Sequence, residues 1–187
     1  MGQDGPATGL GADLRALRQA RGLTLAALAA AAGRSVGWMS QVERGLSHPS
    51  VDDLRALAAR LDVDLSTLLA PEGPPAERGL VVRDGARRPI GSRHEGLMEE
   101  LVSPDLTDAF EVVRSTFAPG ARLDRLARRP TQEVGYVVAG GLDLTVGAET
   151  FRLGPGDSFR LRGQPFAWLN PHPEPCVVLW VIAPPIY

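Results

Sequence analysis

The chain has 187 residues, one cysteine (Cys176) and a formal net charge of −2. A single cysteine excludes an internal disulfide framework, and no apolar run approaches the roughly 20 residues that a membrane helix needs. Residues 1–5 lack the basic and apolar pattern of a signal peptide, so we expect a cytoplasmic protein with no membrane partner.

The first part of the chain, residues 10–70, is predicted to be an all-α domain of five helices after a flexible N-terminus over residues 1–9. Apolar residues recur at helical spacing in the first two segments, which Gly22 separates, and Thr24 is the predicted N-cap of the second. Turn and start signals for the remaining helices lie at residues 32–35, 49–50 and 64–69.

The segment 34–45 predicts a short amphipathic helix that begins at the N-cap Ser35 and ends at a glycine. Outside its apolar stripe, Gln41 can bond adenine, Arg44 can reach a phosphate and Val36 can touch a thymine methyl. This small polar face is typical of a helix that reads DNA. The residues expected to contact DNA are Thr24, Arg34, Ser35, Val36, Gly37, Trp38, Ser40, Gln41, Arg44 and His48.

Several motifs of this region occur at a characteristic spacing: Leu14-Arg15-Ala16-Leu17-Arg18, Gly22-Leu23-Thr24, Leu28-Ala29, Gly33, Ser40-Gln41-Val42-Glu43-Arg44-Gly45 and Pro49-Ser50. In these motifs the region resembles the phage-repressor-like helix-turn-helix domains, also called the xenobiotic-response-element type. The resemblance implies that Thr24 begins the positioning helix and that helix 35–44 enters the major groove. It also implies that Arg18 and Glu43 form a structural ion pair.

The charge of the helical part predicts modest affinity for DNA. Residues 1–70 contain seven arginines and seven acidic residues, so the contribution of counterion release to binding should be small. We therefore expect binding to depend on a homodimer. Its two-fold symmetry would match a palindromic operator in double-stranded DNA.

The composition changes at Pro71, and we interpret residues 71–89 as a linker and entry strand because the proline-rich start cannot continue a helix. An all-β domain is predicted over residues 90–187, as a sandwich or barrel of short strands separated by glycine-rich turns. The predicted strands cover residues 80–83, 98–103, 110–117, 134–138, 142–146, 150–153, 158–161, 166–170 and 176–182.

The second half carries the segments Phe117-Ala118-Pro119-Gly120, Glu133-Val134-Gly135-Tyr136-Val137-Val138-Ala139-Gly140, Leu153-Gly154-Pro155-Gly156-Asp157-Ser158 and Asn170-Pro171. In these it resembles the cupin domain, a jelly-roll barrel. Many cupins hold a metal with three histidines and a glutamate, and the resemblance places Ala127, Arg129, Glu133 and Phe166 at those positions. Because one carboxylate cannot complete a metal site, we expect neither a metal nor another cofactor.

The alternation of strand residues predicts a ligand pocket inside the barrel, formed by Arg129, Glu133, Val137, Phe166 and Trp168. Arg129 could form a salt bridge with Glu133 that seals the pocket, or it could clamp a small metabolite that carries a carboxylate. Aromatic residues such as Phe166 and Trp168 are more often barrel core than a platform for a ligand. The three histidines are interpreted as surface residues, with His48 the best candidate for a phosphate contact.

The sequence contains no nucleophile elbow and no phosphate-binding loop with lysine. We therefore predict a multidomain, sequence-specific DNA-binding transcriptional regulator whose cupin domain dimerises and senses a small metabolite, and not an enzyme. The alternatives are a cupin enzyme with an appended helix-turn-helix domain, and a protein-interaction module of antitoxin type.

Overall fold

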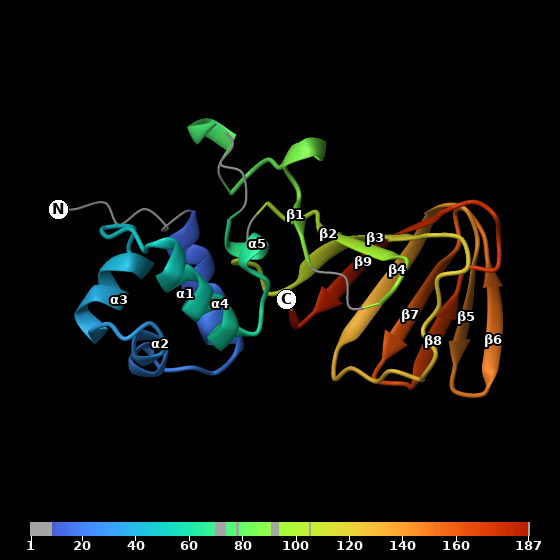
Figure 1. Ribbon diagram of the computed structural model, residues 1–187. Coiled ribbons are helices and arrows are strands. Elements are labelled where there is room, and N and C mark those ends of the chain that lie inside the picture. The colour runs from blue at the N-terminus through green and yellow to red at the C-terminus, as the bar shows by residue number, and fades with distance from the viewer. Residues whose placement is uncertain (1–8, 70–73, 78, 91–93, 105, 187) are drawn as a thin grey trace. The chain divides into compact units, whose positions relative to one another are not determined.

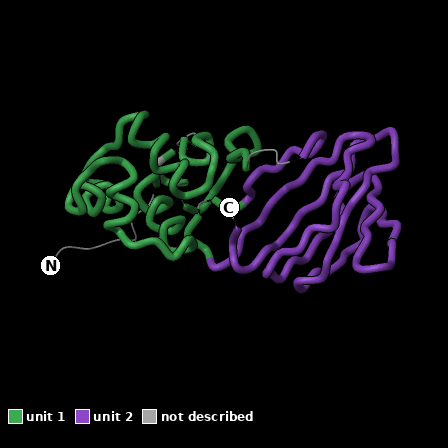
Figure 2. Tube along the Cα trace, turned by 60° about the horizontal axis from the view of Figure 1, so that its bottom comes forward, with its two compact units in different colours: residues 1–90, 103–108, 187 green, residues 91–102, 109–186 purple. Residues whose placement is uncertain are grey.

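The computed structural model describes residues 9–69, 74–77, 79–90, 94–104 and 106–186. The chain divides into a helical unit of residues 1–90, 103–108 and 187, and a strand unit of residues 91–102 and 109–186 (Figure 2). Residues 1–8 of the predicted flexible N-terminus and residues 71–73 and 78 of the predicted linker lie outside the described part. No described helix is long and apolar enough to cross a membrane.

Five α-helices form the described part of the helical unit, which confirms the prediction. Hydroxyl caps determine where three of them begin, since Thr24, Ser35 and Ser50 each accept a hydrogen bond from the backbone N–H three residues later. Six apolar side chains fill the core: Leu14, Leu17, Leu28, Met39, Leu57 and Leu61. The helices are α1 (Leu10–Ala20), α2 (Leu25–Ala31), α3 (Val36–Glu43), α4 (Val51–Leu61) and α5 (Leu65–Leu68) (Figure 1).

A short segment from later in the chain completes the helical unit. Residues 103–108 belong to this unit, and the side chain of Leu106 is only 1% exposed. The backbone N–H of Leu106 donates to the Asp13 carboxylate at 3.3 Å, and Arg88 pairs with the same carboxylate at 2.7 Å. The helical unit therefore contains residues that precede strand β2 (Leu97–Leu101) in the sequence and residues that follow it.

The strand unit is built from antiparallel strands, as the predicted all-β domain requires. In one sheet the order is β2-β3-β9-β4-β7, and in the other it is β6-β5-β8 (Figure 1). Their bounds are β3 (Glu111–Phe117), β4 (Gln132–Ala139), β5 (Leu142–Val146), β6 (Glu149–Leu153), β7 (Ser158–Arg162), β8 (Phe166–Leu169) and β9 (Cys176–Ala183).

Alternate residues of β3, β4 and β9 point to the barrel interior. Glu111 of β3 and Glu133 of β4 both lie opposite Ile182 of β9, and Val113 and Gly135 both lie opposite the next inward residue of β9, Trp180. The inward faces of three neighbouring strands therefore share rows of residues. This register brings acidic and aromatic side chains into the interior together.

The strand predicted over residues 80–83 is wrong. Leu80 lies in a turn and is 75% exposed. Arg83 forms an ion pair with Glu77, which precedes this turn in the sequence. Apolar residues alone cannot define a strand where they have no sheet to cover. The segment instead holds two single-turn 3₁₀ helices, Pro75–Glu77 and Asp84–Ala86, and the two-residue strand β1 (Arg88–Pro89).

Candidate DNA-binding helix and ligand cavity

Helix α3 has one buried side and one exposed side. Met39 and Val42 are buried, whereas Val36 is 48% exposed and Gln41 and Arg44 are exposed. The exposed side therefore offers an amide, a guanidinium and a branched apolar group. The other predicted contacts on this segment are the exposed residues Ser35 and Gly37 and the half-buried residues Trp38 and Ser40.

A mostly buried ion pair lies on the inner side of α3 and confirms the predicted pair. Arg18 of α1 donates from Nε to Glu43 at 2.6 Å and from Nη2 to the second carboxylate oxygen at 3.0 Å. Its Nη1 also donates to the carbonyl of Leu23 at 3.0 Å. One guanidinium thus links α1, α3 and the turn before α2, which fixes the orientation of the exposed side of α3.

Arg34, predicted to contact DNA, is already engaged within the helical unit. Its guanidinium bonds both carboxylate oxygens of Asp53, at 2.9 and 3.1 Å, and it lies 5.3 Å from the ring centre of Trp38. Arg34 and the hydroxyl and backbone N–H of Ser50 hold the pKa of Asp53 far below its usual range. Arg34 therefore joins the start of α3 to the start of α4.

The remaining predicted contacts lie on segments next to α3. The Thr24 hydroxyl accepts from the Ala27 N–H at 3.1 Å at the start of α2, and His48 lies in the segment before α4. Arg44 donates to the Ser40 carbonyl at 3.2 Å while its side chain stays exposed. These groups lie at the ends of helices and in the segments around the exposed side of α3.

The barrel of the strand unit encloses a small cavity of about 30 Å³. Three of the five predicted pocket residues, Arg129, Phe166 and Trp168, line it. Glu133 is 1% exposed and Val137 is fully buried, and neither side chain lines the cavity. The cavity is otherwise lined by His94, Leu97, Glu99, Phe117, Leu123, Ala127, Trp180 and Ile182.

Glu133 is held by a threonine on one side and approached by an arginine on the other. The Thr131 hydroxyl donates to Oε1 of Glu133 at 2.6 Å. Arg129 Nη1 lies 3.7 Å from Oε2 of Glu133, which is too long for a hydrogen bond. The Arg129 guanidinium also lies 5.6 Å from the ring centre of Phe166, so a cation already occupies part of this site.

The fold brings three further residues to the interior that were not predicted as pocket residues: Glu99, Glu111 and Trp180. Glu111 is 1% exposed, and burial together with the nearby carboxylates of Glu99 and Glu133 raises its pKa to about 7. Glu111 lies on the same side of β3 as buried Val113, but the sequence alone does not show which side of β3 faces inward. His94, interpreted as a surface residue, instead packs edge-on against Trp168 with ring centres 5.8 Å apart.

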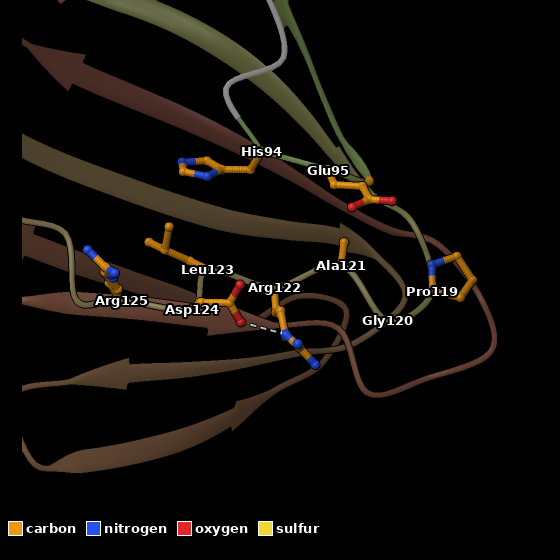
Figure 3. Close-up of a pocket in the computed structure, with 10 residues that line it drawn as sticks. His94, Glu95, Pro119, Gly120, Ala121, Arg122, Leu123, Asp124 and Arg125 are labelled. Carbon is orange, nitrogen blue, oxygen red and sulfur yellow. Dashed lines mark hydrogen bonds and ion pairs between the residues drawn. The ribbon is translucent and has the colours of Figure 1, made fainter.

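The cavity adjoins an open hollow of about 630 Å³, with which it shares His94 and Leu123. Figure 3 shows His94 and Glu95 on one side of this hollow and Arg122 with Asp124 on the other. Arg122 and Asp124 pair at 2.6 Å. The hollow offers charged groups of both signs outside the small interior cavity.

The positions that hold metal in many cupins do meet in space. Ala127 and Phe166 form a β-bridge, and Arg129 approaches both Phe166 and Glu133. Within the described ranges no group of three or more histidine, cysteine or acidic side chains is arranged to hold a metal ion.

The helical unit and its exposed α3 define a DNA-binding helix-turn-helix protein with an appended barrel. Residues 10–70 match the family model of a helix-turn-helix domain, and residues 113–182 match that of a cupin domain. The chain belongs to the family of xenobiotic-response-element-type helix-turn-helix transcriptional regulators that carry a cupin domain.

Relatives of known sequence support this assignment along most of the chain. The HTH-type transcriptional regulator SutR of Escherichia coli K12 is 31% identical over 156 residues, which cover 81% of this chain and 80% of SutR. The regulator PuuR of the same strain is 24% identical over 173 residues, 90% of this chain and 91% of PuuR. The structure of KdgF from a Halomonas species covers 58% of this chain and 96% of its own with 21% identity and a TM-score of 0.50, which indicates the barrel fold alone.

Proposed function

We propose that this regulator binds a palindromic operator in the cytoplasm as a homodimer and that its barrel senses a small molecule without catalysing a reaction. The observation that carries the proposal is the two-sided arrangement of α3. The Arg18–Glu43 pair fixes its inner side, and Gln41 and Arg44 lie on its exposed side. A rigid helix with a free polar side can read base edges in the major groove.

The residues near α3 divide into those that read bases and those that position the helix. Gln41 is proposed to bond adenine, and Val36 to touch a thymine methyl group. Arg44 and His48 supply phosphate contacts, and Arg34 positions α3 through Asp53. The same surface is completed by Thr24, Ser35, Gly37, Trp38 and Ser40.

The substitution Gln41→Ala tests the assignment of the base-reading residue. It should cost about 1 to 3 kcal/mol of binding to the operator and relax the preference at one position of each half-site. Arg44→Ala should weaken binding to all DNA sequences and reduce the salt dependence. Gln19→Ala, at an exposed position of α1, is the matched control. Fluorescence anisotropy with operator and random duplexes measures both quantities, and an unchanged ratio for Gln41→Ala would refute the assignment.

The proposed dimer surface is the outward face of β4 and β9. Val134, Tyr136 and Val138 of β4 and Val181 of β9 are each 45 to 47% exposed, and Val134 lies opposite Val181 in the sheet. Contiguous exposed apolar side chains of this kind mark association surfaces. A second copy of the chain would cover them and provide the two-fold symmetry that a palindrome requires.

The substitution Tyr136→Asp tests this surface. A buried charge at the interface should shift the protein to monomers and weaken operator binding. Phe151→Asp is the matched control, because Phe151 is 50% exposed on β6 and lies outside the surface. Sedimentation velocity measures the mass. A dimer that survives Tyr136→Asp at micromolar concentration would exclude this face.

A further inference from the structure

The charges that face the barrel interior are predominantly negative. Glu99 lines the cavity, and Glu111 and Glu133 flank the cavity residue Ile182 on the neighbouring strands. Arg129 is the one arginine among the described residues that line the cavity. Glu111 is partly protonated at neutral pH because its pKa is about 7. Glu99, Glu133 and the ionised fraction of Glu111 still exceed the single charge of Arg129, and this excess of negative charge favours a cation and disfavours an anion.

Two of these carboxylates keep an oxygen without a hydrogen-bond donor in the described part of the chain. Both are 1% exposed, and the unpaired atoms are Oε2 of Glu111 and Oε2 of Glu133. Their other oxygens accept from the Ile186 N–H at 3.1 Å and from the Thr131 hydroxyl at 2.6 Å. Buried acceptors without donors are costly, so the interior favours groups that donate hydrogen bonds.

The side chain of Arg129 shows how a cation uses this site. It lies 3.7 Å from the unpaired oxygen of Glu133 and over the ring of Phe166, yet 32% of its side chain is exposed. The pairing is therefore loose, and water competes with it. A small cation with several N–H donors could replace Arg129 at Glu133 while Arg129 moves outward.

We propose that the barrel binds a small organic ammonium ion, whose N–H groups donate to the unpaired carboxylate oxygens of Glu111 and Glu133 and displace Arg129. The site rests on the sensing role proposed above and names its ligand class. A cavity of about 30 Å³ matches the volume of one water-sized group, which suits an ammonium head. The rest of the ligand would extend toward the adjoining hollow of Figure 3.

The lining of the cavity also suits an ammonium ion. Trp168 and Trp180 line it with Phe117 and Phe166, and aromatic rings attract cations through their π-faces. The indole N–H of Trp180 has no acceptor in the described part of the chain, so it can bind an acceptor atom of the ligand. A carboxylate ligand could use Arg129, but it would lie beside Glu99 and close to the unpaired oxygen of Glu133 that Arg129 approaches.

Calorimetric titration of the full-length protein with n-butylammonium chloride and with sodium butyrate tests the proposal. The buffer must contain no amine. We expect n-butylammonium to bind and butyrate not to bind. Glu111→Gln and Glu133→Gln should each weaken ammonium binding about tenfold or more, because charge-assisted hydrogen bonds are lost. Glu149→Gln, an exposed acid on β6, is the matched control and should bind as the wild type does.

Arg129→Gln separates the two ligand classes by the sign of its effect. If Arg129 competes with the ligand, the substitution should tighten n-butylammonium binding about two- to fivefold. Arg129 is partly exposed, so Arg129→Gln should disturb folding less than a change at a buried glutamate. The variant therefore still tests the proposal if a glutamate variant fails to fold. Butyrate binding that Arg129→Gln abolishes would overturn the proposal in favour of a carboxylate ligand, and the absence of binding by n-butylammonium would also overturn it.

Operator binding measured in the same solutions separates this site from the proposed function. Ammonium binding that alters the operator affinity supports both. Ammonium binding with unaltered operator affinity supports the site and refutes the sensing role. A chain that fails to bind any operator refutes the proposed function, and the calorimetric result still decides the site.

Discussion

The substitution Glu111→Gln should change how the stability of this protein depends on pH. The pKa of Glu111 is raised from 4.5 to about 7, first by burial and then by Glu99 and Glu133, against the Ile186 N–H and Arg129. The folded chain therefore holds a proton that the unfolded chain releases between these pH values. Its free energy of unfolding should fall as the pH rises from about 4.5 to about 7, and stay lowered above that.

The size of this loss follows from the gap between the two pKa values. For a carboxyl group that is 1% exposed, the gap corresponds to about 3 kcal/mol at pH values above 7. The glutamine side chain of the variant cannot ionise, and its amide oxygen can still accept from the Ile186 N–H. The variant should thus lose this part of the pH dependence and be more stable than the wild type above pH 7, by up to that amount.

Urea unfolding from pH 4.5 to 8.5 in buffers without amines measures the effect. The free energies of wild type and variant should diverge as the pH rises, whereas Glu149→Gln, an exposed acid, should run parallel to the wild type. Parallel curves for Glu111→Gln would show that Glu111 ionises normally and would refute the reasoning from burial.

Two further predictions concern packing. Arg18→Ala and Glu43→Ala should each cost about 3 kcal/mol because each leaves a mostly buried charge without its partner, and the double variant should cost less than the sum. A thermal unfolding cycle measures this coupling, and additive costs would contradict it. Gly135→Ala should cost about 1 to 3 kcal/mol, since its Cβ would lie 2.2 Å from the ring of Phe159. Gly37→Ala, where the nearest atom is 3.9 Å away, should not lower the melting temperature, and equal losses for both glycines would refute the steric explanation.

Local signals in the sequence predicted the helical unit well. Ser35 and Thr24 cap helices where their hydroxyls indicate, and the family motifs predicted the Arg18–Glu43 pair. The engagement of Arg34 with Asp53 was not predicted, because nothing local links residues that meet only after α3 and α4 pack. An exposed arginine at the start of α3 can thus have a partner within the chain.

The barrel was harder to predict at the level of its interior. Periodicity identified most strands, and the positions of Arg129 and Phe166 relative to Glu133 followed from the cupin pattern. Glu111 was missed because it lies at the first residue of β3, where the parity of an inward face shows only once the register with β9 is known. Leu80 was misassigned since apolar character does not reveal whether a neighbouring strand exists.

The position of residues 103–108 in the helical unit has a practical consequence for dividing this chain. A gene fragment that stops at residue 90 would encode α1 to α5 but not Leu106, whose buried side chain is part of the same unit. The fragment would also lack the Leu106 N–H that bonds Asp13. Shortened versions used to study DNA binding should therefore extend through residue 108, or supply that segment as a separate peptide and test whether it restores the melting temperature.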